Sequence, residues 1–364
     1  MGFLKKLFKT NDSLEGRYKN FWKWFYEREG EFHNVLKENG DVHGVFFTHL
    51  AKKLDLVKEG FWYLAGMNDN ETAELIITVD SDVKNIAFAE ELINAAPKIP
   101  GWTFTALKQA LDISHIKIAM DGFEFSKDNL FFYQNEIQEY PDEVDITVVH
   151  NDYTEENKSI ITNGVYIFLE HYLGELRFST DIDNLIVEGK KESKKELIPI
   201  IKLNEFLYWR EKEFVEKYSG VKHDTENDAH ASFEAQLGNG YVMIGVVNTD
   251  LINWDAKASH PWLVHVEISY DGGNNNGLPI KSDYQLLDQI ENLANSLLKD
   301  VDGYLNVGRE SGNNQRSIYF ACKDFRLPSK VFYELQKEYA SKFEINFSIY
   351  KDKYWRSVEK FQLG

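Results

Sequence analysis

The stretch Trp262-Leu-Val-His-Val-Glu-Ile-Ser-Tyr270 opens the part of the sequence that decides the fold. Every second residue from Trp262 onward is apolar, which predicts a β-strand with one face in a core. The segment that follows predicts a helix, because apolar residues recur with a 3.6-residue period across 286–298. Ser282 and Gln285 match a capping box, so we expect this helix to begin directly after Ser282.

The rest of the C-terminal region continues to alternate between strand and helix patterns. Strand patterns lie at 304–309, 316–322 and 343–349, and a second helix pattern starts at Pro328. The resulting order, β-α-β-β-α-β, predicts a ferredoxin-like sandwich of the α+β class. This architecture carries enzymes, binding modules and regulators alike, so it does not by itself identify a function.

The residues before this region predict further α+β structure with antiparallel strands. A helical pattern is followed by a β-β-α-β pattern and by several shorter strands and helices. Gly238-Asn239-Gly240 separates two strand patterns and predicts a hairpin within a polar, acidic segment. The predicted division is a helical N-terminal segment (1–58), an α+β domain (59–220), an acidic linker with a hairpin (221–258) and the ferredoxin-like domain (259–364).

Composition favours a cytoplasmic protein. No apolar run approaches the roughly 18 residues of a membrane-spanning helix, so no membrane association is expected. Cys322 is the only cysteine and lies in a strand pattern, which excludes an intramolecular disulfide and indicates a small buried side chain. The basic and apolar opening, residues 1–9, is interpreted as a frayed terminus, with a short membrane-surface anchor as the alternative.

The net charge of −18 is concentrated in two stretches. Residues 139–156 carry seven carboxylates without a lysine or arginine, and residues 223–234 carry four carboxylates and two histidines. Such a field repels phosphate backbones, so we expect no nucleic-acid partner. It attracts a basic protein or a metal ion, although the same composition also serves solubility alone.

Chain topology brings two polar loops together at one end of the predicted sandwich. Helices return the chain between strands, so loop 271–277 and hairpin 310–315 lie at the same end. Two arginines beside asparagine-rich turns can bind a carboxylate or a peptide, although asparagine and glycine also simply suit tight turns. The candidate contact residues are Asn274, Asn275, Asn276, Arg309 and Arg316.

A second candidate site lies in the acidic linker. Two imidazoles and several carboxylates occur within eight residues, and divalent transition metals favour such mixed ligands. The candidate ligands are His223, Glu226, Asp228 and His230, which would support a metal-assisted hydrolase. Their spacing matches no standard site, so a plain acidic linker is the preferred explanation. No phosphate-binding loop, dinucleotide fingerprint, hydrolase elbow or zincin motif is present, so no cofactor is predicted.

Four short motifs carry a family resemblance. They are His260-Pro-Trp-Leu-Val264, Asn276-Gly-Leu-Pro279, Val307-Gly-Arg309 and Ile318-Tyr-Phe-Ala-Cys-Lys-Asp324. In this order the segment 258–355 resembles the bacterial family called domain of unknown function 695. That family has no assigned activity, so the resemblance implies a fold and no catalytic residues.

Two wider resemblances complete the interpretation. The opening Phe21-Trp-Lys-Trp-Phe25 and the segment Ala95-Ala-Pro-Lys-Ile-Pro-Gly-Trp102 are similar to an uncharacterised bacterial family of the same plan. A more distant likeness, in fold type and acidity, is to regulator of ribonuclease activity B. We therefore expect a non-enzymatic interaction or regulatory protein that docks a basic partner, such as a nuclease or RNA-processing protein. The alternatives are a metal-assisted hydrolase and a small-ligand binding module.

Overall fold

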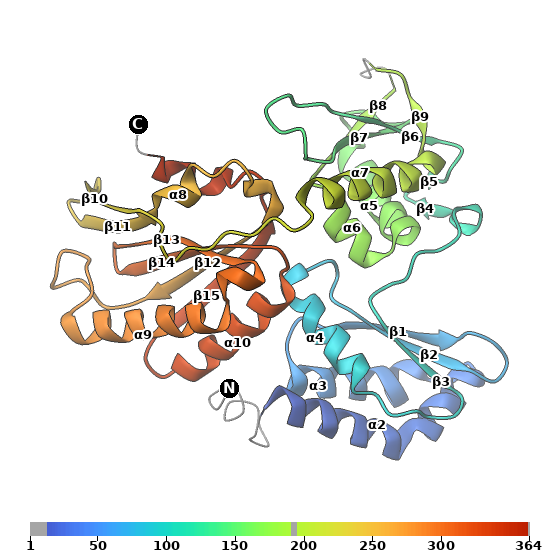
Figure 1. Cartoon of the computed structure of the whole chain (residues 1–364). Coiled ribbons are helices and arrows are strands. Elements are labelled where there is room, and N and C mark those ends of the chain that lie inside the picture. The colour runs from blue at the N-terminus through green and yellow to red at the C-terminus, as the bar shows by residue number, and fades with distance from the viewer. Residues whose placement is uncertain (1–12, 191–194, 363–364) are drawn as a thin grey trace. The chain divides into compact units, whose positions relative to one another are not determined.

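A computed structural model describes residues 13–190 and 195–362, which mix helices and strands along the chain as an α+β protein. The chain forms two compact units (Figure 1). Unit 1 contains Met1–Gln134 and Ile146–Glu205, and unit 2 contains Asn135–Asp145 and Phe206–Gly364. The basic opening 1–9 and most of the lysine-rich run 190–195 lie outside the described residues.

The first half of unit 1 is a three-stranded sheet with aromatic-rich helices. Its order is β1-β2-β3, with β1 antiparallel to β2 and, unlike the prediction, β3 parallel to β2. Phe21, Trp22 and Phe25 of its first helix are buried. The elements are α2 (Leu14–Lys37), η1 (His43–Phe47), α3 (Thr48–Val57), β1 (Trp62–Met67), β2 (Ala73–Thr78), α4 (Val83–Asn94) and β3 (Trp102–Ala106).

The second half of unit 1 holds a four-stranded sheet of order β8-β7-β6-β9. Strand β6 is antiparallel to both β7 and β9. The elements are η2 (Ile113–His115), β4 (Ile118–Met120), β5 (Phe123–Phe125), β6 (Leu130–Gln134), β7 (Asp145–His150), α5 (Lys158–Leu173), α6 (Glu175–Asp181), β8 (Asn184–Gly189), β9 (Ile198–Pro199), η3 (Ile200–Lys202) and α7 (Leu203–Tyr218), whose later part belongs to unit 2.

Unit 2 is built on a six-stranded sheet of order β10-β11-β13-β14-β12-β15, in which all neighbours are antiparallel. Its remaining elements are β10 (His230–Gln236), β11 (Val242–Asn248), α8 (Thr249–Ile252), η4 (Lys257–Ser259), β12 (Trp262–Ser269), α9 (Lys281–Leu297), η5 (Asp300–Asp302), β13 (Tyr304–Gly312), β14 (Gln315–Cys322), α10 (Arg326–Tyr339), β15 (Glu344–Lys351) and η6 (Arg356–Phe361).

The hairpin β10–β11 extends this sheet beyond the predicted β-α-β-β-α-β region. Strand β11 pairs with β13 from Met243 to Val247, so the hairpin assigned to the linker 221–258 shares a sheet with the strands after residue 259. The predicted capping box is wrong: α9 begins at Lys281 after Ile280, which forms no side-chain cap. Ser282 therefore lies inside the first turn.

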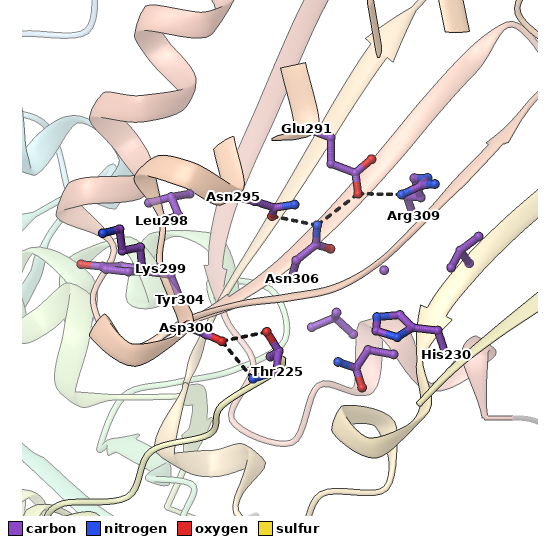
Figure 2. Close-up of a pocket in the computed structure, with 14 residues that line it drawn as sticks. Thr225, His230, Glu291, Asn295, Leu298, Lys299, Asp300, Tyr304, Asn306 and Arg309 are labelled. Atoms are coloured by element: carbon purple, nitrogen blue, oxygen red, sulfur yellow. Dashed lines mark hydrogen bonds and ion pairs between the residues drawn. The ribbon is translucent and has the colours of Figure 1, made fainter. Parts of the chain in front are cut away.

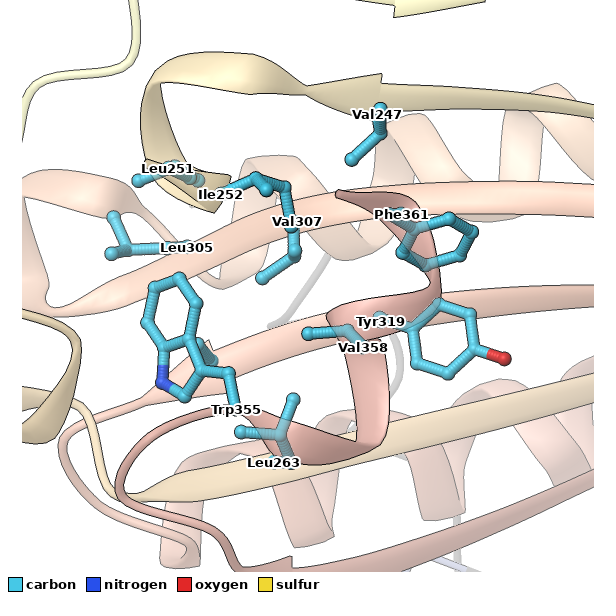
Figure 3. Packing of buried hydrophobic residues seen from close by; sticks show 11 residues of the cluster. Val247, Leu251, Ile252, Leu263, Leu305, Val307, Tyr319, Trp355, Val358 and Phe361 are labelled. Carbon is cyan, nitrogen blue, oxygen red and sulfur yellow. The ribbon is translucent and has the colours of Figure 1, made fainter. Parts of the chain in front are cut away.

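The two faces of the sheet are covered by different elements. Helices α9 and α10 pack on one face, where Phe320 contacts Phe332. The opposite face is closed by α8 and by η6 with the residue that precedes it. They contribute Leu251, Trp355 and Phe361 to a buried cluster (Figure 3). Cys322 is fully buried in β14, as predicted, and burial raises the pKa of its thiol. Within residues 13–190 and 195–362, no helix combines the length and hydrophobicity needed to cross a bilayer.

Candidate functional site

A pocket of about 400 Å³ lies in unit 2 beside α9, over strands β11 and β13 (Figure 2). We call it the polar pocket, because most of its lining side chains carry hydrogen-bonding groups. Its lining residues are Thr225, His230, Val246, Asn248, Glu291, Asn295, Leu298, Lys299, Asp300, Tyr304, Asn306, Val307, Gly308 and Arg309.

A β-bulge in β13 aims two of these side chains into the pocket. The register of β13 against β14 shifts between Asn306 and Gly308. Val307 points into the cluster on the opposite face, whereas Asn306 and Arg309 both line the pocket. Without the bulge, residues three apart would face opposite sides of the strand. Gly308 permits this close pairing, since a Cβ atom there would lie 2.7 Å from the carbonyl oxygen of Val246.

Glu291 of α9 is the centre of a hydrogen-bonded network in the pocket. The residue is only 5% exposed. Its Oε1 accepts a hydrogen bond from Asn306 Nδ2 at 3.1 Å and another from Arg309 Nη1 at 3.1 Å. Asn306 Nδ2 also donates to Asn295 Oδ1 at 3.0 Å, so α9 and β13 are joined by side chains across the pocket wall (Figure 2).

The second carboxylate oxygen of Glu291 is left without a donor. Oε2 is buried and accepts no hydrogen bond from the described residues. Arg316 Nη1 lies 3.9 Å from this oxygen, beyond hydrogen-bonding distance. An ionised carboxylate has about four acceptor positions, and leaving a buried one unfilled costs about 1–3 kcal/mol. A donor supplied by a ligand would remove that cost.

A smaller pocket of about 220 Å³ adjoins the polar pocket, and we call it the side pocket. The two pockets share Val246 and Arg309. Arg316 lies beneath the side pocket, 1% exposed, where Nε donates to Ser311 Oγ and Nη1 pairs with Asp288 at 2.7 Å. The lining residues are Ile244, Val246, Asn275, Leu278, Pro279, Tyr284, Arg309, Ser311 and Arg316.

The structure brings together three of the five predicted contact residues. Asn275, Arg309 and Arg316 line the side pocket. Asn275 Nδ2 also donates to two carbonyl oxygens of its own loop, so it holds the turn as well. Asn274 is exposed, and Asn276 contributes its backbone oxygen to the amide of Val242. Neither lines a pocket described here.

The two loops predicted to meet do meet. The amide of Asn314 donates to the oxygen of Gly277, and the amide of Tyr270 donates to the oxygen of Asn314, each at 2.9 Å. The turn before β15 lies at the same end, because Glu344 pairs with Ser269. The arginines, however, are aimed away from the loop tips toward α9.

The predicted metal ligands do not assemble into a site. Asp228 is committed to His223 Nε2 and to Asn248 Nδ2, each at 2.7 Å. His230 Nδ1 lies 3.0 Å from the backbone oxygen of Asp228, and Glu226 is exposed. Nowhere in the described part of the chain do three or more His, Cys, Asp or Glu side chains form a group suited to a metal ion. Asp228 is instead used in structural contacts, because its carboxylate links the segment before β10 to Asn248 at the end of β11.

Part of the predicted acidic surface is also used inside unit 2. Asp142 accepts hydrogen bonds from Lys217 and from the hydroxyl of Tyr354, and although burial opposes the shift, these donors lower the pKa of its carboxyl. Glu143 is buried and pairs with Arg356 at 2.7 Å. Three of the seven carboxylates in 139–156, Asp142, Glu143 and Asp145, therefore lie in internal contacts rather than on a free surface.

Sequence reasoning missed the central residue of the polar pocket. Glu291 lies four positions after Leu287 and three before Ala294, so it interrupts the apolar stripe of α9 with a charge. That interruption was the available signal, because a carboxylate on a buried helix face needs partners or a function. The glycine in Val307-Gly-Arg309 was a signal of a bulge or of a close backbone approach.

Comparison with known proteins gives one match. Residues 235–361 match the model of a family described as a family of unknown function (DUF695). The match covers about a third of the chain and includes β11, α9 and β13, which form the walls of both pockets. It supports the family resemblance for this segment. No curated protein and no solved structure matches the chain significantly.

Proposed function

We propose that this protein is a non-enzymatic interaction protein that binds a basic segment of a partner protein at the polar pocket. The scaffold in this proposal is a ferredoxin-like sandwich widened by the hairpin β10–β11. The strand order supports it, since the fourth strand of the β-α-β-β-α-β unit (β15) pairs with the first, the first with the third, and the third with the second.

One observation carries the proposal. Glu291 is nine-tenths buried, lines a polar pocket, and keeps one oxygen without a hydrogen-bond donor. Rotation about the terminal torsion of a glutamate is soft, so the carboxylate can reorient when a ligand supplies a donor in exchange for the bonds that Oε1 makes to Asn306 and Arg309. Lysine and arginine side chains carry several N–H donors and no acceptor, which matches the missing interaction.

Long-range charge supports a basic partner. The chain carries −18, which attracts cations and accelerates their encounter. Within the polar pocket the charges balance, because two carboxylates, Glu291 and Asp300, and two cations, Arg309 and Lys299, line it. Recognition in the pocket therefore rests on directed hydrogen bonds, while the field of the whole chain favours basic partners at a distance.

The test uses two capped amino acids as probes, N-acetyl-lysine methylamide and its uncharged counterpart N-acetyl-norleucine methylamide. We expect the lysine probe to shift the NMR signals of α9 and β13 and the norleucine probe to leave them unchanged. Substitution Glu291→Gln should weaken lysine binding about 10-fold or more, because a hydrogen bond to a charged group contributes about 1.5–3 kcal/mol.

The matched control is Glu359→Gln, which removes the same charge from an exposed position in η6. It should bind the lysine probe as the unmodified chain does. If both variants lost the same affinity for the lysine probe, overall charge would explain the effect. If norleucine bound as strongly as lysine, the pocket would not be specific for a hydrogen-bond donor.

A further inference from the structure

We infer that the two pockets together recognise an extended peptide, with a lysine or arginine in the polar pocket and an apolar side chain two positions away in the side pocket. This inference rests on the proposed function and adds the sequence pattern of the partner segment. It is carried by the arrangement of the pockets along β11, by their different chemistry, and by the Glu291 oxygen that has no hydrogen-bond donor.

The pockets follow one another along the strands. On β11, Ile244 lines the side pocket, Val246 lines both, and Asn248 lines the polar pocket. Alternate residues of a strand face the same side, at a repeat of about 6.8 Å. The same shift occurs on β13, where Ser311 lines the side pocket and Asn306 the polar pocket.

The shared boundary is a cross-strand pair. Val246 lies opposite Arg309 in the register of β11 and β13, and both side chains line both pockets. A ligand that occupies both pockets therefore passes over this pair. The two ligand side chains that enter the pockets are therefore about as far apart as residues i and i+2 of β11. Residues i and i+2 of an extended peptide have the same separation.

The side pocket suits an apolar side chain. Leu278 and Pro279 form part of its wall, and Ile244 and Tyr284 add apolar surface that is 41% and 44% exposed. The guanidinium of Arg316 lies 4.9 Å from the Tyr284 ring centroid and is already paired with Asp288. No open carboxylate lines this pocket, so burial of an aliphatic or aromatic group is the interaction it offers.

The experiment compares short capped peptides with a glycine and serine background and the full chain as receptor. One peptide carries Lys-Gly-Leu, and the others replace leucine by alanine, lysine by norleucine, or place lysine and leucine next to each other. The reversed order Leu-Gly-Lys is included because both chain directions fit the repeat. We expect one of the two spaced peptides to bind about 5-fold or more tightly than its alanine counterpart and than the adjacent version.

Receptor variants complete a double-mutant cycle. Ile244→Ser should weaken the spaced Lys/Leu peptide about 5-fold and leave its alanine counterpart unchanged, because only leucine uses that wall. Ile280→Ser is the control, since Ile280 is 49% exposed and lines neither pocket. It should change neither affinity.

The outcomes separate the two proposals. If lysine peptides bind through Glu291 regardless of leucine or spacing, the two-pocket inference is overturned and the lysine site stands. If no lysine peptide binds, or Glu291→Gln changes nothing, the proposed function falls together with this inference.

Discussion

Glu175 in unit 1 and Glu291 in unit 2 are both buried, but their surroundings supply them with different numbers of hydrogen bonds. Glu175, the first residue of α6, is fully buried in unit 1. Its Oε1 accepts from the amides of Val79 and Ser81 at 2.9 and 3.0 Å. Its Oε2 accepts from the amide of Lys108 at 3.0 Å and from the hydroxyl of Thr78.

Glu291 in unit 2 is almost as buried but only half satisfied. Its two hydrogen bonds both fall on Oε1, and Oε2 has none among the described residues. The comparison separates two uses of a costly group. A carboxylate with every acceptor position filled fastens backbone segments together, whereas one with an open position beside a pocket is prepared for a ligand.

The largest effect is expected at Glu175 and tests whether its carboxylate stabilises the fold. Glu175→Gln replaces one acceptor oxygen by an NH₂ group that faces at least one backbone N–H donor, so a buried amide is left unpaired. We expect a loss of about 3–5 kcal/mol in the free energy of unfolding, measured by chemical denaturation. A loss below about 1 kcal/mol would mean that the filled carboxylate is not a structural fastener.

His260 is a test of whether every buried polar group without a hydrogen-bond partner marks a ligand site. The residue is fully buried, its Nε2 has no hydrogen-bond partner among the described residues, and it lines none of the pockets described here. Burial, together with the nearby charges of Lys323 and His223, lowers the pKa of its imidazole to about 3. We expect it to act on stability alone.

The pH dependence follows from that shift. In the unfolded chain the imidazole takes up a proton below about pH 6.5, while in the folded chain it stays neutral down to about pH 3. Stability is therefore complete above pH 6.5 and falls on acidification by up to about 1.4 kcal/mol per pH unit. The measurement compares the free energy of unfolding at pH 6.5 and at pH 4.5. Between these two values His260→Phe should lose about 2–3 kcal/mol less than the unmodified chain does. Its binding of lysine at neutral pH should be unchanged.

The smallest expected effect completes the comparison. Glu291→Gln should change the free energy of unfolding by about 1 kcal/mol or less, even though it is the same substitution as in Glu175. Glutamine keeps an oxygen for Asn306, the Arg309 side chain is 30% exposed and can be hydrated, and Arg316 retains Asp288. Denaturation of both variants under one condition measures the difference, and equal losses would remove the distinction between the two carboxylates.

Local structure in unit 2 was largely predictable from the sequence. The alternation that begins at Trp262 and the apolar stripe of α9 place strands and helices within a few residues of their observed bounds, because both patterns report which side chains face a core. The hairpin around Gly238-Asn239-Gly240 was also found, since its turn chemistry is local. The predicted start of α9 was wrong, because the helix begins at Lys281 and Ser282 lies in its first turn instead of capping it.

The candidate site was less predictable, because it depends on contacts between distant segments. Arg309 and Arg316 were identified, but their direction follows from the β13 bulge and from the pairing of β11 with β13. Neither the bulge nor the strand pairing can be predicted from the hydrophobic periodicity of the sequence. The acidic linker residues suggested a metal for the same reason: the sequence could not tell that Asp228 is engaged by Asn248 twenty residues later.

The hairpin β10–β11 also has a consequence for the width of unit 2. Six strands span five spacings of about 4.8 Å, or about 24 Å, while two helices about 10 Å wide cover about 20 Å. The hairpin widens the sheet without adding a helix, and Ile244 of β11 stays 41% exposed on the face that α9 and α10 cover. Both pockets border β11, the strand at which helical cover runs short. We therefore expect that a longer hairpin would lengthen the surface that borders both pockets.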